Sequence, residues 1–437
     1  MKKVSIITLG CAKNQSDTDH LAGLLKRRGF TVETDPSKAD AIVVHTCSFI
    51  ESAKKESIEA IVEAGRLKGE SKKLIVTGCM VQHHGKEMLA ELPEADILLG
   101  TGQLGQIPDL LQKEFPRFLD RRDPGGFFDP DAPRHLSTSG PTATLRLSEG
   151  CGHPCSFCVI PKLRGGLQSR PEEHILDEAK TLIQNGVQEL MLIGQDTGDW
   201  GRDKGSGTRL PALLRKLGAL NGIRWIRLMY MHPVSFNADL LSVLAESPSL
   251  FPYLDMPLQH IDDGILKNMN RNIGEDETRR LLDTVHEKLP HISLRTTFIV
   301  GFPGETGKEF AKLNAYVKEG HFDTMGAFAY SAEEGTPAAL LPNQIPDHVK
   351  IERHAALIES QFDVFQRKAK ARVGRTEQVV LEEQEDGFLY GRTSREAPEI
   401  DAVVRLSDKK CKPGQFVEAT LTGVDGYELT ADLKASL

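Results

Sequence analysis

Apolar runs recur along the first 116 residues, at positions 4–9, 41–44, 74–76 and 95–102. Amphipathic segments, notably 17–28 and 50–66, separate them. Continuous apolar strands with helices between them are typical of a parallel sheet covered on both faces. The pattern therefore predicts an N-terminal α/β domain over residues 1–116.

A second alternation starts near residue 145 and continues for almost 190 residues. The predicted strands are 145–148, 189–194, 225–230, 253–257, 294–301 and 324–330, and the predicted helices are 171–185, 210–219, 237–246, 275–287 and 305–319. Six β/α units with right-handed crossovers predict an incomplete (β/α)6 barrel over residues 141–370. The amphipathic segment 347–370 is expected to be a closing or connecting helix.

The two remaining regions, 117–140 and 371–437, have different sequence patterns. Residues 117–140 are dense in Pro, Gly and Asp without periodicity, which indicates a linker. From residue 371 to 437, five short alternating segments separated by turns predict a small antiparallel β-barrel of OB-like type. The fold class is therefore α/β, with a small β-barrel at the C-terminal end.

Composition describes an ordinary globular protein: 437 residues, 39% hydrophobic, 27% charged and a net charge of −8. That charge argues against a bare nucleic-acid binder, which usually carries a basic face. Residues 372–437 hold nine Lys/Arg and thirteen Asp/Glu, a balance of −4. OB-like barrels often bind RNA, but an acidic barrel without aromatic stacking residues suits a basic protein partner better.

The first residues superficially resemble a lipoprotein signal, because Met-Lys-Lys precedes the apolar run that ends at Cys11. That run has about six residues, shorter than the ~7–15 of a signal sequence. No run approaches the ~18 apolar residues of a membrane span. We expect a cytoplasmic protein that does not enter the membrane.

Three of the seven cysteines stand together after the predicted strand 145–148, in the spacing C-x3-C-x2-C: Cys151, Cys155 and Cys158. Clustered thiolates in a loop are soft ligands suited to zinc or to an iron–sulfur cluster. The spacing supplies one ligand fewer than a closed four-coordinate site needs. Either a fourth ligand comes from elsewhere, or one metal position stays open for substrate.

Three further cysteines, Cys11, Cys47 and Cys79, each follow an apolar run of the N-terminal domain. The carboxyl ends of parallel strands meet at one edge of a sheet, so these thiols are expected to converge there. The alternative is three buried small hydrophobes, a common fate of cysteine. Two sites with three thiolates each are an unusual zinc design and suit two 4Fe–4S clusters, each with one open iron. Cys411, alone in the tail, is expected to be incidental.

The segment "RLSEGCGHPCSFCVIPKLRGG", with Phe157 before the third cysteine, resembles the signature of radical S-adenosylmethionine (SAM) enzymes. The N-terminal cysteines and the trailing barrel narrow the resemblance to the methylthiotransferases, whose tail is a TRAM domain. The segments "TLGCAKNQSDTDHL", "YLDMPLQH", "RTTFIVGFPGET" and "FAYSAEEGTPA" look most like the branch that modifies an aspartate of small-subunit ribosomal protein number twelve. Ala12 stands where many members have proline, next to a ligand but not one itself.

The resemblance implies two 4Fe–4S clusters. Cys151, Cys155 and Cys158 would hold the one whose open iron binds SAM and generates a radical that takes hydrogen from the aspartate β-carbon. Cys11, Cys47 and Cys79 would hold an auxiliary cluster that presents the sulfur, and a further SAM would supply the methyl group. The implied partners are the basic ribosomal protein and an electron donor such as flavodoxin or ferredoxin, and the enzyme is expected to be a monomer.

Candidate SAM contacts are fewer and less specific. The resemblance puts Phe157 near the adenine, together with the backbone of Gly301 and Gly304, although a simple βα turn would also explain those glycines. Gln195 and Asp196 end the second barrel strand and are candidate SAM or ribose contacts.

More distant candidates are Gln259, His260 and residues 231–233, which also lie at strand ends, and Arg164 and Arg170, which could meet a carboxylate. A structural role for His260 and solvated positions for the two arginines are the ordinary alternatives.

Two other functions compete with this one. The first is the same chemistry on a transfer-RNA adenosine, which the acidic tail disfavours because RNA binding depends on Lys and Arg meeting phosphates. The second is a zinc-stabilised binding module without catalytic activity.

Overall fold

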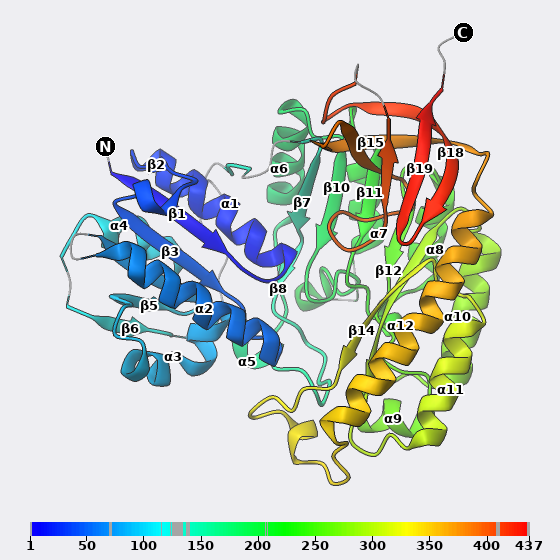
Figure 1. Cartoon of the computed structure of the whole chain (residues 1–437), viewed down its shortest axis with the longest axis horizontal. Helices are drawn as coiled ribbons and strands as arrows, with labels where there is room; N and C mark the ends of the chain where they lie inside the picture. Colours follow the sequence, from blue (N-terminus) through cyan, green and yellow to red (C-terminus); the bar gives the residue numbers. More distant parts are fainter. Residues whose placement is uncertain are drawn as a thin grey trace.

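A computed structural model describes residues 2–69, 72–114, 116–122, 124, 134–136, 140–205, 207, 209–407 and 411–434. Three bodies follow one another along the chain (Figure 1). They are an N-terminal α/β layer structure, a central open sheet of six parallel strands with helices outside it, and a small C-terminal β-barrel. Within these residues no helix combines the length and apolar character that crossing a membrane requires.

The N-terminal sheet has six parallel strands in the order β2-β1-β3-β4-β5-β6. The strands are β1 (Lys3–Thr8), β2 (Thr31–Val32), β3 (Ala41–Thr46), β4 (Lys73–Gly78), β5 (Ile97–Leu99) and β6 (Phe118–Asp120). The helices are α1 (Ala12–Arg27), α2 (Glu51–Lys68), α3 (Cys79–Glu91) and α4 (Ile107–Leu111), with single 3-10 turns η1 (Pro36–Lys38) and η2 (Leu104–Gln106). The last strand lies inside the predicted linker, of which 123, 125–133 and 137–139 are outside the described residues.

Burial of the central strand explains why its sequence is continuously apolar. All six residues of β3 are buried. Because side chains alternate along a strand, Val43 packs in the cluster that includes α1 and α4, while Ile42 and Val44 pack in the cluster that includes α2 and α3. Both faces of the sheet are therefore covered by helices, as the sequence predicts.

The central sheet is also wholly parallel, in the order β14-β13-β12-β11-β10-β7, and its two edge strands do not pair with each other. Its strands are β7 (Thr142–Arg146), β10 (Glu189–Ile193), β11 (Trp225–Leu228), β12 (Tyr253–Asp255), β13 (Ser293–Val300) and β14 (Thr324–Ala329). The main helices are α6 (Glu172–Gln184), α7 (Leu210–Gly218), α8 (Ala238–Glu246), α10 (Glu275–Lys288), α11 (Gly307–Lys318) and α12 (Asp347–Lys370). This confirms the predicted incomplete barrel.

Short elements occupy the carboxyl ends of these strands. They are the antiparallel pair β8 (Ser148–Glu149) and β9 (Gln168–Ser169), the helices α5 (Ile160–Arg164) and α9 (Asp263–Asn268), and the 3-10 turns η3 (Arg202–Lys204), η4 (Pro233–Ser235) and η5 (Pro337–Leu340). Functional groups of open α/β sheets gather at this end.

The C-terminal barrel closes in the order β15-β16-β17-β19-β18. Its strands are β15 (Thr376–Glu385), β16 (Phe388–Thr393), β17 (Val403–Leu406), β18 (Phe416–Asp425) and β19 (Glu428–Leu433). Four pairings are antiparallel, whereas β17 and β19 run parallel, a detail that the alternating pattern does not predict. Cys411 lies half-buried against the barrel core.

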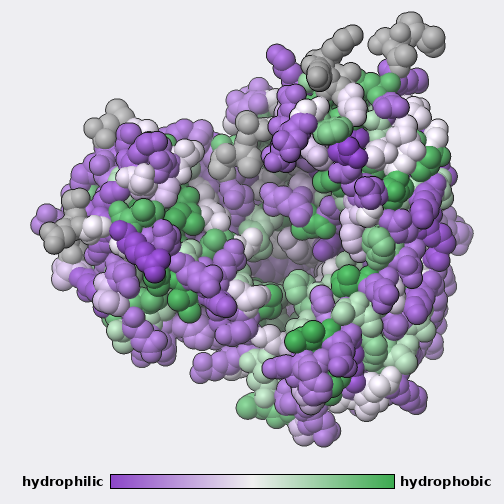
Figure 2. Space-filling view, in the orientation of Figure 1, coloured by the Kyte–Doolittle hydropathy of each residue, from purple (hydrophilic) through white to green (hydrophobic). Residues whose placement is uncertain are grey.

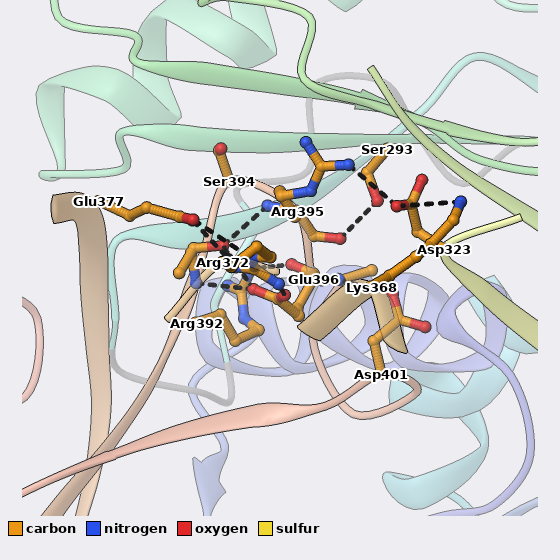
Figure 3. A network of polar contacts seen from close by, with 12 residues as sticks. Ser293, Asp323, Lys368, Arg372, Glu377, Arg392, Ser394, Arg395, Glu396 and Asp401 are labelled. Carbon is orange, nitrogen blue, oxygen red and sulfur yellow. Dashed lines mark hydrogen bonds and ion pairs between the residues drawn. The ribbon is translucent and has the colours of Figure 1, made fainter. Parts of the chain in front are cut away.

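The segment between β16 and β17 fixes this barrel to the central sheet (Figure 3). Arg395 pairs with Asp323 at 2.9 Å, and the carbonyl of Arg395 accepts a hydrogen bond from Ser293 at 2.8 Å. Glu396 accepts from Arg372 at 2.5 Å. Nearby, Ala397 packs with Met191 and Ile193 of β10, Met229 just after β11 and Tyr253 of β12, so the segment packs against the middle of the open sheet.

A second set of contacts joins the same two bodies without exposure to water. Arg392 of β16 lies 2.7 Å from Glu189, the first residue of β10, and Arg227 of β11 also pairs with Glu189. The side chains of all three are at most 1% exposed. Burial raises the pKa of the Glu189 carboxyl, but the two guanidinium groups outweigh burial and hold that pKa at about 2.

The N-terminal domain is joined to the central sheet by helix α1. Lys13 lies 2.6 Å from Glu149, and Asp17 lies 2.9 Å from Arg164 and also pairs with Arg146. All five side chains are nearly inaccessible to water. The polar start of α1 is therefore an interface, and it determines where Cys11, the residue before the helix, lies relative to the barrel.

Candidate active site

The cysteine loop, residues 150–158, leaves β8 at the carboxyl end of the central sheet. Gly150 begins it with φ +68°, and a Cβ there would lie 2.1 Å from the carbonyl oxygen of Gly166 and 2.5 Å from that of Gly165. The amide of Cys151 donates to the Gly165 carbonyl at 3.1 Å. The backbone approach is so close that only glycine fits at position 150.

The segment after α9 holds the middle of the loop. Ser156 donates from its amide to the carbonyl of Met269 at 3.0 Å and from its hydroxyl to that of Asn268 at 2.7 Å. The amide of the Asn270 side chain donates to Pro154 at 2.8 Å. Arg271, 4% exposed, reaches the sulfur of Cys155 at 3.5 Å, so a fixed positive charge lies beside the thiol.

His153 holds the loop from the opposite side. Its Nε2 lies 2.7 Å from Asp196 and 3.3 Å from Asp199, and its ring stacks on His232 with centroids 4.0 Å apart. Burial lowers the pKa of His153, but the two carboxylates outweigh burial and raise that pKa to about 9. The sequence did not single out His153 or Asp199 for this role, because their pairing depends on a contact across more than forty residues.

Each group of three cysteines is called a trio below. The second trio, Cys11, Cys47 and Cys79, lies at the carboxyl edge of the N-terminal sheet, after β1, β3 and β4. A Cβ on Gly10 would lie 2.6 Å from Cβ of Cys47, so the backbone before Cys11 passes directly over that residue. Cys79 packs with Val159 and Leu163, which directly follow the cysteine loop. The two trios thus share a boundary.

Both trios suit a cluster better than a zinc ion. A tetrahedral zinc at ~2.3 Å from each thiolate would hold the sulfurs about 3.8 Å apart. Among the described residues, His153, Asp196 and Asp199 are the one group of His, Cys, Asp or Glu ligand atoms all within 4.8 Å of one another. In each cysteine trio at least one pair of sulfurs is therefore more widely spaced, as expected when each thiolate binds a different iron.

Burial disfavours the thiolate form of four of these cysteines in the absence of metal: Cys47, Cys79, Cys151 and Cys158. Burial raises the pKa of Cys47 to about 12, and the neighbouring Cys79 and Cys11 add to the effect. Burial also raises the pKa of Cys151 to about 12 and that of Cys158 to about 11. Ligation must displace the thiol protons, so cluster assembly and folding of the site are coupled.

A cavity of about 1070 Å³ opens between the three bodies, and Figure 2 shows a hollow at the centre of this face of the molecule. It is lined by Cys11 of one trio and by Phe157 of the cysteine loop. The C-terminal barrel contributes Glu382, Glu383 and Tyr390 to its wall. Its size suits a cofactor together with part of a second molecule. One cavity is therefore bordered by a cysteine of the N-terminal domain, by the cysteine loop and by the C-terminal barrel.

The predicted SAM contacts differ in whether their polar groups already have partners within the protein. Phe157 packs with Phe302, which stands between the two predicted glycines. The amide of Gly301 donates to Glu305 at 3.0 Å, and that of Gly304 donates to Asn343 at 3.0 Å, so both are satisfied within the protein. They stay predictions.

The other two predicted contacts differ sharply. Asp196 is buried, and its carboxylate accepts from His153, from the Ser235 hydroxyl at 2.6 Å and from the backbone amides of Gly198 at 2.9 Å and His232 at 3.1 Å. The buried amide oxygen of Gln195 has no hydrogen-bond partner among the described residues, which fits a group that binds a ligand. Both remain predicted SAM contacts.

Three weaker candidates are structural. The Nε2 of His260 lies 3.3 Å from the carboxylate of Glu305, with both side chains fully buried. The expectation that Arg164 and Arg170 are solvated is wrong. Both are buried, and Arg170 pairs with Glu178 at 2.6 Å.

Comparisons with known proteins agree with this arrangement. Three family models match the chain: uncharacterized protein family UPF0004 over residues 3–100, the radical SAM superfamily over 145–317 and the TRAM domain over 373–433. Among solved structures, the radical SAM methyltransferase TsrM from Kitasatospora setae has a TM-score of 0.55 and 16% identity, covering 78% of this chain and 77% of that one. The enzyme OxsB has a TM-score of 0.51 and 13% identity, covering 84% and 56%. Both show the fold.

Curated relatives are much closer in sequence. The ribosomal protein uS12 methylthiotransferase RimO of Thermoanaerobacter sp. (strain X514) is 42% identical over 436 residues, which cover 99% of this chain and 100% of the relative. RimO of Geobacter sulfurreducens is 41% identical over 440 residues, covering 99% and 98%. With such identity along its whole length, the chain belongs to the radical SAM methylthiotransferase family of the ribosomal protein uS12 type.

Proposed function

We propose that this protein attaches a methylthio group to the β-carbon of an aspartate in ribosomal protein uS12. The observation that carries the proposal is the cavity, because Cys11, Phe157 of the cysteine loop and residues of the C-terminal barrel line it together. A hydrogen-abstracting centre and a sulfur source must reach the same carbon atom, and one shared cavity meets that requirement.

We propose that Cys151, Cys155 and Cys158 hold one 4Fe–4S cluster, and that Cys11, Cys47 and Cys79 hold the auxiliary one. Three thiols at each site leave one iron without a protein thiolate, which suits SAM at the first site and sulfur at the second. Once bound, the clusters and SAM supply the one-electron chemistry that opens an unactivated C–H bond, the sulfur and the methyl group.

The protein's own residues orient and enclose these groups. Arg271 keeps a positive charge beside Cys155, and the hydrogen bonds of Ser156 fix the middle of the cysteine loop. Phe157 and Phe302 provide an apolar wall for the adenine. Buried ion pairs of α1 hold the two sites at a fixed separation, which a reaction between them needs.

The cavity wall favours a basic substrate that also carries apolar groups. Six carboxylates and two guanidinium groups line it, which leaves four negative charges in excess: Asp19, Asp255, Glu333, Glu382, Glu383 and Glu399 against Arg134 and Arg295. Exposed Phe49, Phe328, Ile400 and Val403 surround the same space. Such a surface attracts a ribosomal protein and repels the phosphates of RNA.

We propose that each of the three domains has its own role. Residues 1–116 carry the auxiliary cluster, residues 141–370 carry the radical chemistry, and residues 371–437 recognise the substrate. We further propose that the enzyme works as a monomer in the cytoplasm and receives electrons from a flavodoxin or ferredoxin.

Incubation of the reconstituted enzyme with SAM, a reductant and either purified uS12 or transfer RNA tests the function. Mass spectrometry is expected to find the methylthio group on uS12 only. A methylthio group on transfer RNA alone would refute the proposal, and a colourless protein with zinc and no acid-labile sulfide would refute the chemistry. Cys158→Ala should abolish SAM cleavage, whereas Cys47→Ala should retain cleavage and lose sulfur insertion.

A further inference from the structure

Backbone strain is concentrated in the cavity. Seven described residues other than glycine have a left-handed φ, and four of them, Asn270, Asn272, Asn343 and Asp386, are of types that tolerate it. The remaining three are Tyr230 (φ 58°), Gln259 (φ 72°) and Glu399 (φ 66°), and all three line the cavity. Strained residues of unfavourable type persist where the surrounding structure imposes them, commonly at functional sites.

Hydrogen bonds from two sides hold Tyr230 in its conformation. It follows β11 at the carboxyl end of the central sheet, and its amide donates to the carboxylate of Asp255 at 3.1 Å. Its carbonyl accepts from the amide of Thr197 at 3.2 Å, and the amide of Met231 donates to the Asp255 carbonyl at 2.9 Å. Strands on both sides of β11 thus fix the direction in which the ring leaves the backbone.

The ring extends toward the auxiliary cysteine site. Tyr230 packs with Ala12 in a small apolar cluster. Cys11 and Glu399 are among the groups that lie near enough to interact with its hydroxyl electrostatically. The side chain is half-buried. Its hydroxyl makes no hydrogen bond to any residue in the part of the chain that the structure describes, which leaves a phenolic donor at the cavity wall.

Other strong donors at the wall are already engaged. Arg295 pairs with Asp255 at 2.9 Å. Arg134 pairs with Asp19 at 2.8 Å and with Glu178 at 3.0 Å. Among the described lining residues, an anionic group that enters this acidic cavity therefore finds no guanidinium free of a protein carboxylate, so neutral donors such as the Tyr230 hydroxyl are the partners available to it.

The proposed function requires an anion to enter. The target aspartate carries its carboxylate next to the carbon atom that loses hydrogen, so a hydrogen bond to that carboxylate also fixes the orientation of the C–H bond. We propose that the Tyr230 hydroxyl binds the carboxylate of the target aspartate and so selects aspartate and aligns its β-carbon. This inference rests on the proposed function and adds a substrate-binding residue to it.

Gln259, the second strained residue, lies nearer the other site. Two residues before it, the carbonyl of Pro257 accepts from Arg271, which in turn contacts Cys155. Gln259 therefore borders the radical-generating side, and Tyr230 borders the sulfur side, where the modified carbon must finish.

Tyr230→Phe removes the hydroxyl and keeps the ring, the packing and the left-handed backbone. The experiment compares the full-length reconstituted variant with wild type for two synthetic peptides from the target loop of uS12, one with the aspartate and one with asparagine in its place. Binding is measured by fluorescence anisotropy. The amounts of 5′-deoxyadenosine and methylthiolated product are measured in parallel. Tyr427→Phe, at an exposed turn of the C-terminal barrel, is the matched control.

We expect Tyr230→Phe to weaken binding of the aspartate peptide by about 10- to 100-fold, and that of the asparagine peptide by much less, because a hydrogen bond to a charged group is lost. SAM cleavage should continue with less product for each 5′-deoxyadenosine. The ratio of the two affinities is unaffected by any loss of folded protein. Equal weakening for both peptides, or an unchanged amount of product for each 5′-deoxyadenosine, would overturn the role of Tyr230. Wild type that cleaves SAM and leaves the aspartate peptide unmodified would instead refute the proposed function.

Discussion

Two glycines of the cysteine loop meet very different surroundings. A Cβ on Gly150 would collide with two backbone carbonyl oxygens, whereas a Cβ on Gly152 would meet nothing within 4 Å. The Gly150→Ala variant should therefore lose the cluster of the cysteine loop and keep the auxiliary cluster, with roughly half the wild-type iron and sulfide. Gly152→Ala should keep the full content. Iron and acid-labile sulfide assays check this, and equal contents in the two variants would contradict the geometry.

Charge at the cavity wall can also be tested at single positions. Glu383 and Glu399 are exposed glutamates of the C-terminal barrel that line the cavity, whereas Glu418 is an exposed glutamate of the same barrel outside the lining. Glu383→Gln and Glu399→Gln should each raise KM for uS12 several-fold, and added salt should shrink the difference. Glu418→Gln changes the net charge equally and should leave KM unaltered. A similar effect from all three would mean that only total charge matters.

At the residue scale, the six proposed cysteine ligands could be named from the sequence and stay predictions, whereas the residues that hold their loops in place could not be named. A cysteine after an apolar strand is a local signal, so all six proposed ligands could be named. Tyr230 and the His153–Asp199 contact could not, because neither a left-handed φ nor a pairing between distant loops leaves a mark on composition or periodicity.

At the scale of elements, helix α1 departs most from its prediction. The apolar pattern predicts a helix over 17–28, but the helix begins at Ala12, directly after Cys11. Its first turns are polar and buried, including Lys13, Asn14 and Asp17. Polar residues at the start of a helix are normally interpreted as exposed, and only the packed neighbour reveals the interface.

That interface predicts a large difference between two aspartates. Asp17 is buried between Arg146 and Arg164, whereas Asp109 forms an exposed pair with Arg28. Asp17→Asn leaves the two buried arginines with only Glu149, which they share with Lys13, and should lower the free energy of unfolding by about 3–5 kcal/mol. Asp109→Asn should cost less than about 1 kcal/mol. Urea denaturation measures both, and equal losses would show that α1 is not the joint between the domains.

The strands of both sheets were largely predictable because each is a continuous apolar run. Short edge strands were not: β2 has two residues and β6 has three, too few for a periodic signal. The parallel pairing of β17 with β19 was also missed, since alternation along a strand carries no information about the direction of its neighbour.

At the scale of the whole molecule, attachment of the C-terminal barrel should depend on pH. The folded-state pKa of Glu189 is about 2, below its ordinary value of 4.5. A depressed carboxyl pKa stabilises the fold above pH 4.5, and that contribution is lost as the pH falls toward 2. Trp225 packs on Phe416 of the barrel at 5.0 Å between ring centroids, so its fluorescence should report detachment of the apoprotein in this range.

The matched variant for this pH experiment is Glu189→Gln. It should be less stable than wild type above pH 4.5, because Arg227 then lacks its buried counter-charge and Arg392 keeps only Glu382. Its stability should also depend less on pH between 4.5 and 2. A wild-type pH profile that persists unchanged in the variant would assign the transition to other carboxylates.

The relative position of the three bodies could not be derived from the chain, because it depends on buried ion pairs and on the segment between β16 and β17. The proposed function depends on this relative position. This position puts Cys11, Phe157 and Glu399 around one cavity although they lie in three separate domains.

The distance between the two clusters tests this arrangement most directly. Pulsed electron paramagnetic resonance on the reduced, fully reconstituted enzyme should detect magnetic coupling between them, and the coupling should vanish in Cys47→Ala and in Cys158→Ala. The wild-type spectrum should therefore differ from the sum of the two variants' spectra. A wild-type spectrum equal to that sum would mean that the clusters are isolated from each other, and would contradict a shared cavity for sulfur insertion.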